Sequence, residues 1–136
     1  MTDFTLDERL SNSSHLIDIH HNIEIRLADD ERFFWLLLIP QTGGLKEWHQ
    51  IPSAQMQVMH SLMTKISRKL EIRKQPDKIN IGALGNIVSQ FHLHIVLRYK
   101  DDTAWPGPIW GNGTPVPLTA EEKQDRMALI RAILAE

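Results

Sequence analysis

Two histidines stand two residues apart in a segment that has the pattern of a β-strand. From Gln90 to Arg98, apolar side chains alternate with polar ones and β-branched and aromatic residues are frequent, which predicts an extended strand. Because successive side chains of a strand point to opposite faces, Gln90, His92 and His94 would share one face. We therefore expect two imidazoles and an amide, spaced by roughly 6–7 Å, to contact one anionic group.

An imidazole on such a face can act as a nucleophile, because a covalent intermediate replaces one difficult displacement by two easier ones. A neutral imidazole is a competent nucleophile near pH 7 because its ordinary pKa is about 6.5. For His92 to attack, its second ring nitrogen must donate to a backbone carbonyl that fixes the tautomer, and His94, if protonated, would supply positive charge. Gln90 can donate an N–H but carries no charge, and loss of one such donor typically costs about 2.7–4 kcal/mol.

The two histidines have two alternative interpretations. A single histidine on a strand is most often a residue without chemistry, but two on one face, followed by a loop rich in Gly, Pro and Trp, favour a functional role. A His-x-His pair can also bind zinc, yet it supplies only two ligands. His20, His21 or His49 would have to complete such a site, so we expect neither a metal nor another cofactor.

Length and composition predict one globular domain over residues 1–136. Hydrophobic residues make up 42% of the chain and charged residues 24%, with fifteen Lys and Arg against seventeen Asp and Glu, which is ordinary for a globular protein. Without a run of basic residues, the chain has no surface suited to duplex nucleic acid. Without cysteine, disulfides, thiolate nucleophiles and Cys-based zinc sites are excluded.

Nothing in the sequence indicates a membrane or an export signal. The longest apolar run, from Phe33 to Pro40, is far shorter than a membrane span. The N-terminus lacks the basic region and the apolar region of a signal peptide. We therefore expect a cytoplasmic location.

The pattern of apolar residues predicts the elements that hold the histidine segment. Alternation predicts a strand from about Ile19 to Leu27, and a continuous apolar run predicts a second strand, buried on both faces, that ends at Pro40. Ser53 and Thr119 are candidate N-caps of amphipathic helices. The expected elements are a short N-terminal helix within 3–14, strands over 19–27, 33–39, 78–84 and 90–99, helices over 53–70 and 119–135, and a packed loop over 101–117.

With these elements in place, the chain resembles the histidine triad (HIT) family of nucleotide hydrolases and transferases. The motif of that family is His-φ-His-φ-His-φ-φ, where φ is apolar, and here Gln90 stands for the first histidine. The resemblance covers residues 19–111 and includes Leu37-Leu38-Ile39-Pro40 and Trp105-Pro106-Gly107. A triad that begins with Gln and is followed by Asp-Asp-x-Ala-Trp-Pro-Gly-Pro-x-Trp-Gly is similar to a bacterial branch described as diadenosine-polyphosphate-hydrolase-like.

The resemblance implies a fold, an assembly and a role for each residue. The fold is α+β, an antiparallel sheet of about five strands with one long helix packed on it and a C-terminal helix. The assembly is a homodimer whose two sheets join side by side. His92 would attack the α-phosphate of an adenosine polyphosphate, and His94 would bind phosphate or the leaving group. Asn86 would also touch phosphate, and Asp29 would hold the ribose hydroxyls.

Two other functions remain open from the residues alone. The chain could be a non-catalytic nucleotide-binding module, which the replacement of the first histidine by Gln90 favours. It could also be a metal-dependent hydrolase, which the His-x-His spacing permits.

Overall fold

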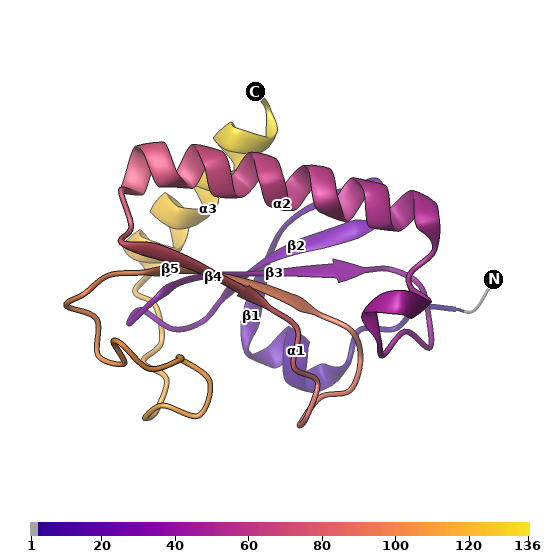
Figure 1. Cartoon of the computed structure of the whole chain (residues 1–136), viewed down its shortest axis with the longest axis horizontal. Helices are drawn as coiled ribbons and strands as arrows, with labels where there is room; N and C mark the ends of the chain where they lie inside the picture. Colours follow the sequence, from indigo (N-terminus) through magenta and orange to yellow (C-terminus); the bar gives the residue numbers. More distant parts are fainter. Residues whose placement is uncertain (1–2) are drawn as a thin grey trace.

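The structure is a computed structural model that describes residues 3–136 (Figure 1). The first two residues of the single domain predicted over 1–136 lie outside the described part. The elements in chain order are α1 (Glu8–Asn12), β1 (Ser14–His20), β2 (Ile23–Ala28), β3 (Phe34–Pro40), the single 3-10 turn η1 (Trp48–Gln50), α2 (Ser53–Lys74), β4 (Lys78–Gly82), β5 (Leu93–Arg98) and α3 (Ala120–Leu134).

The strands form one antiparallel sheet in the order β1-β2-β3-β5-β4. The predicted α+β fold, with about five antiparallel strands, a long helix and a C-terminal helix, is therefore confirmed. Because β5 lies between β3 and β4, the histidine segment runs through the interior of the sheet. β1 and β4 are its two edges.

The two faces of the sheet carry different partners. Figure 1 shows α2 running across one face. Alternate residues of the strands pack there against α2 and α3, in a core that includes Leu36, Ile95, Ile66 and Ile130. On the other face, α1 and the loop after β5 cover smaller clusters around Leu37 and Val96. The intervening residues of β5, including His94, point to this second face.

One strand was missed by the sequence pattern. The sheet begins at Ser14 rather than at the predicted Ile19, and residues 14–20 form the edge strand β1. A bulge shifts the β1–β2 register between Leu16 and Asp18. It breaks the period-two alternation, so that Leu16 and Ile19 are exposed while Ile17 is buried. The strand therefore carries no clear alternating pattern.

The ends of the helices partly differ from the prediction. The N-cap of α2 is Pro52, without a side-chain hydrogen bond, so the expected cap at Ser53 is wrong. The expected cap at Thr119 is confirmed, because its hydroxyl accepts a hydrogen bond from the Glu122 amide at 3.1 Å. Within the helix predicted over 3–14, only Glu8–Asn12 is helical.

The long loop between β5 and α3 is packed, as predicted, and is held to β5 by an ion pair. Arg98 is 2% exposed and donates to the two carboxylate oxygens of Asp102 at 2.7 and 3.0 Å. The same carboxylate accepts from the backbone amides of Ala104 and Trp105 at 3.0 and 2.7 Å. The Arg98 guanidinium beside Asp102 lowers the pKa of that carboxyl to about 2.

No helix within residues 3–136 combines the length and the apolar character needed to cross a bilayer.

Candidate active site

The two histidines of the motif lie together on the face of the sheet opposite α2. Leu93, Ile95 and Leu97 of β5 belong to the core beneath the helices. His92 and His94 line a cavity on the other side, with their ring centroids 4.8 Å apart. The period-two pattern thus predicted their common face, although β5 itself begins at Leu93, after His92.

The backbone fixes the tautomer of His92. Its Nδ1 lies 2.7 Å from the carbonyl oxygen of Gln90. A carbonyl oxygen only accepts, so Nδ1 carries the proton and donates it. The lone pair of the neutral ring is then on Nε2, which is the arrangement that a nucleophilic imidazole needs.

His94 has the opposite arrangement. The indole Nε1–H of Trp35 donates to Nδ1 of His94 over 2.9 Å, so the ring proton of neutral His94 is on Nε2. Burial, together with the neighbouring His92, lowers the pKa of His94 to about 3. Near pH 7 the His94 ring is therefore neutral, so the condition under which it would supply positive charge is not met.

Gln90 does not face the cavity with the two histidines. Its side-chain Oε1 accepts from the amide of Asp7 at 2.8 Å, and its Nε2 donates to the carbonyl oxygen of Thr5 at 2.9 Å. Both polar atoms of the amide thus hold the N-terminal segment. We expected the Gln90 side chain to contact an anion beside the two histidines. In the structure it binds the N-terminal segment instead, and Gln90 contacts His92 through its backbone carbonyl.

The cavity in front of the histidines has a volume of about 580 Å³. Its walls come from four parts of the chain: the end of α1, the turn between β2 and β3, the segment before the histidines, and the loop after β5. They contribute, among others, Leu10 and Ser13, Asp29 and Arg32, Leu84 to Val88, and Ile109 to Gly113.

Asn86 and Asp29, the predicted substrate-binding residues, both line this cavity. Asp29 Oδ1 accepts from the Leu118 amide at 3.1 Å and lies 3.2 Å from Nε2 of His15. Although burial opposes ionisation, these two contacts outweigh it and lower the pKa of Asp29. Both contacts involve Oδ1. The structure thus brings His92, His94, Asn86 and Asp29 around one cavity and leaves the Gln90 side chain outside.

Arg32 and Asp30 belong to the cavity but were not predicted. Arg32 pairs with Asp30, Nη2 to Oδ2 at 2.8 Å, and its Nη1 donates to the carbonyl oxygen of Asn112 at 2.8 Å. The Asp30 carboxylate also accepts from the Val116 amide at 3.3 Å. The two residues therefore tie the loop after β5 to the β2–β3 turn. In the sequence they look like part of an ordinary charged turn.

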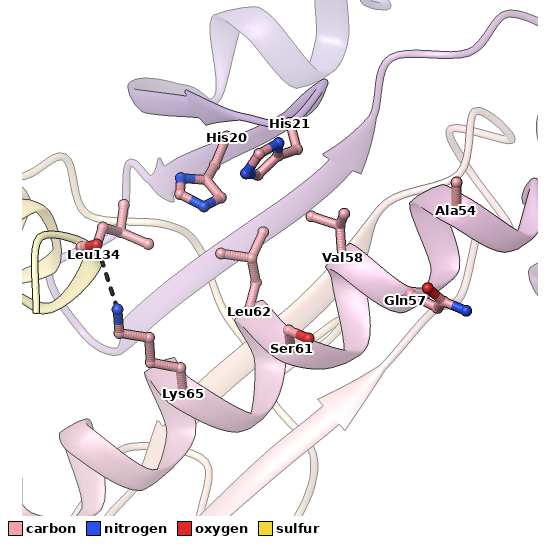
Figure 2. A pocket seen from close by; sticks show the side chains of 9 residues that line it. All are labelled: His20, His21, Ala54, Gln57, Val58, Ser61, Leu62, Lys65 and Leu134. Atoms are coloured by element: carbon pink, nitrogen blue, oxygen red, sulfur yellow. Dashed lines mark hydrogen bonds between the residues drawn. The ribbon is translucent and has the colours of Figure 1, made fainter.

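A second cavity, of about 420 Å³, lies on the helical side of the sheet. Figure 2 shows His20 and His21 across it from α2, with the Lys65 amine bonded to the Leu134 carbonyl at 3.4 Å. The two cavities share no lining residue, so His20 and His21 do not complete a metal site with His92 and His94. Within residues 3–136, no three His, Cys, Asp or Glu side chains are grouped to hold a metal.

Comparisons with known proteins agree with this geometry. The family model of the HIT domain matches residues 11–101. Among solved structures, a histidine triad protein from Sinorhizobium meliloti 1021 is 37% identical, with a TM-score of 0.90 over 95% of this chain and 96% of that chain. One from Marinobacter aquaeolei VT8 is 34% identical, with a TM-score of 0.93 over 98% and 97%. One from Bradyrhizobium japonicum is 32% identical, with a TM-score of 0.91 over 96% and 97%.

A search of curated proteins found no match. The family model covers well over half of the described chain, and the solved relatives exceed 30% identity over nearly its whole length. The chain belongs to the HIT domain family.

Proposed function

We propose that the chain is a nucleotidyl hydrolase or transferase that acts on the α-phosphate of adenosine polyphosphate-type substrates. The observation that carries this proposal is the bond from His92 Nδ1 to the Gln90 carbonyl, which leaves the lone pair on Nε2. In the first step, Nε2 forms a bond to the α-phosphorus, and the bond from phosphorus to the leaving oxygen breaks. The leaving group takes the electron pair.

In the second step, water attacks the nucleotidyl-histidine, and the P–N bond breaks. Nε2 of His92 recovers its lone pair, AMP leaves, and the proton of the water goes to solvent. A different acceptor in place of water gives transfer instead of hydrolysis. His94 Nε2–H and the Asn86 amide would donate to phosphate oxygens, and the carboxylate of Asp29 would accept from the ribose hydroxyls.

A test of this proposal follows the adduct on the protein. After brief incubation with a diadenosine polyphosphate, intact-mass spectrometry should detect one adenylyl group on the wild type, and peptide mapping should assign it to His92. His92→Ala should form no adduct and lose turnover. His60→Ala changes an exposed histidine on α2 and should behave as the wild type. Equal turnover by His92→Ala would remove His92 from the mechanism.

The engagement of Gln90 with the N-terminal segment favours one alternative, a non-catalytic nucleotide-binding module. Of the three motif residues, His92 and His94 then present imidazoles to the anion, and the Gln90 side chain presents no polar group to it. Titration calorimetry with AMP separates the two functions. Tight binding without turnover of any adenylyl donor would support the binding module.

We propose, in addition, that the chain forms a homodimer through the edge strand β4. Within residues 3–136, β4 pairs only with β5, so one side of its backbone is free to pair, and Ile81 in it is 43% exposed. Ile81→Lys should convert a dimer to a monomer in size-exclusion chromatography with light scattering. Ile19→Lys, at a site 46% exposed on the opposite edge strand β1, should leave the dimer intact. A monomeric wild type would contradict the proposal.

A further inference from the structure

Trp35 and His94 form a hydrogen bond that links two neighbouring strands. Trp35 is in β3 and His94 in β5, and the register pairs Leu37 with His94 and Trp35 with Val96. The two side chains lie on the same face of the sheet, and Trp35 Nε1 is 2.9 Å from His94 Nδ1. An indole N–H can only donate. The proton of neutral His94 is therefore restricted to Nε2.

The surrounding rings hold His94 in this orientation. The Trp110 ring lies 5.2 Å from the His94 ring at 69°, and the His92 ring lies 4.8 Å away at 71°. Trp35 itself packs against both apolar clusters of this face of the sheet. A flip of the imidazole would lose the bond from Trp35 without an evident replacement.

The charged groups around His94 do not stabilise a protonated ring. From the β2–β3 turn, Asp29 pairs with His15 and Asp30 pairs with Arg32. β4 presents Gly82 opposite His94. Leu10 of α1 and Ser13, which follows α1, are uncharged, and the neighbour of His94 on its own segment is His92. His94 is 5% exposed, so its proton would be buried without a counter-charge.

We propose that Trp35 is a positioning residue that fixes the Nε2–H tautomer of His94, so that His94 serves the site as a neutral hydrogen-bond donor and not as a proton donor. This inference rests on the proposed nucleotidyl transfer for its chemical meaning. His94 then binds the phosphate or the departing oxygen without giving up a proton. The leaving group departs with its negative charge, and the rate depends steeply on the stability of that anion.

The first experiment needs neither substrate nor mutation. Long-range ¹H–¹⁵N spectra of histidine-labelled protein report the tautomer and protonation of each ring. In the wild type, His94 should keep an unprotonated Nδ1 and a protonated Nε2 throughout pH 5 to 8. Titration of His94 near its ordinary value of about 6.5, or the Nδ1–H tautomer, would overturn the proposal.

Two tryptophan variants then test the contact itself. Trp35→Phe keeps an aromatic ring but removes the donor, so neutral His94 should show a mixture of the two tautomers. Trp110→Phe changes the other indole against His94, which has no hydrogen bond to that ring, and should leave the tautomer unchanged. An unchanged His94 tautomer in folded Trp35→Phe would refute the role of Trp35.

Kinetics with aryl esters of AMP test whether the tautomer of His94 affects catalysis. For the wild type, log kcat should fall steeply as the phenol becomes less acidic. Trp35→Phe should lower kcat by about three- to tenfold at pH 7, as expected for one hydrogen bond. Trp48→Phe, at an exposed tryptophan against Phe91, is the control. A wild type that fixes the tautomer but turns over no ester would refute the proposed function while leaving the positioning role intact.

Discussion

Gln90 stands where the HIT motif begins with a histidine, and its backbone and its side chain make different contacts. The backbone carbonyl accepts from His92 Nδ1 and so orients the His92 ring. The side-chain amide pairs in both directions with the backbone of Thr5 and Asp7, just before α1, whose Leu10 lines the cavity. The Gln90 side chain thus anchors one wall of the cavity.

This division of roles predicts the effect of Gln90→Met, which keeps the length of the side chain but removes both hydrogen bonds. The variant should lose about 1–2 kcal/mol of unfolding free energy, measured by urea denaturation, and the Asp7 amide should exchange faster with solvent. Gln57→Met, at an exposed glutamine on α2, should be neutral. If Gln90→Met lost turnover but neither stability nor amide protection, its side chain would instead act on the anion directly.

At the residue scale, the sequence predicted those features of the site that depend on residues close together in the chain. Strand periodicity put His92 and His94 on one face. The chemistry of attack required a bond from His92 to a backbone carbonyl, and the structure shows that bond at Gln90, two residues away. The partner of His94 is Trp35, 59 residues earlier. That contact depends on the register of β3 and β5, so the tautomer of His94 could not be read from the sequence.

At the scale of elements, the ion pair of Arg98 and Asp102 joins β5 to the loop that walls the cavity. Asp102→Asn would leave the 2%-exposed side chain of Arg98 without a counter-charge. Loss of one partner of a buried pair costs about 3–5 kcal/mol, and chemical denaturation should detect a loss of this size. The matched control is Glu122→Gln, which breaks a pair with Arg126 at the same i,i+4 spacing but with the glutamate 40% exposed, and should cost less than about 1 kcal/mol.

If Asp102→Asn cost no more than Glu122→Gln, Arg98 would be stabilised by its other contacts. These are the Asn80 side chain, which accepts from Nη1 at 2.9 Å, and the Trp105 ring, 5.6 Å from the guanidinium carbon.

Elements with a regular pattern were predicted, and those that depend on tertiary contacts were not. The continuous apolar run of β3 and the amphipathic repeat of α2 gave both elements their correct type. β1 was not predicted, because its bulge between Leu16 and Asp18 disturbs the alternation of apolar and polar residues. The part of the cavity wall that comes from the loop after β5 was not predicted, because Arg32 and Asn112 are 80 residues apart and meet only after the sheet has formed.

At the scale of the whole molecule, the apolar core and the cavity lie on opposite faces of the sheet. One face packs against α2 and α3 and holds most of the apolar core. The other face carries the cavity, whose walls come from α1, the β2–β3 turn and the loop after β5. Burial of His94 between these walls lowers its pKa from 6.5 to about 3, and this links the site to the stability of the whole fold.

The sign of that link follows from proton binding. Above pH 6.5, His94 is neutral in both the folded and the unfolded chain and contributes no pH dependence. Between pH 6.5 and about 3, the unfolded chain binds a proton that the folded chain does not, so the unfolding free energy falls as the pH falls. One such proton gives a slope of at most about 1.4 kcal/mol per pH unit.

Urea denaturation of the wild type between pH 7 and 4.5 should therefore give a declining unfolding free energy. His94→Asn removes the titrating group and should flatten this decline, whatever it costs in stability at pH 7. His60→Asn, on the exposed side of α2, should retain the wild-type slope. The window lies above the range in which the Asp102 carboxyl, with its pKa of about 2, loses its charge, so that ion pair adds little to the slope. An identical slope in the wild type and His94→Asn would show that folded His94 binds its proton as readily as unfolded His94, and the neutral donor inferred for the site would be lost with it.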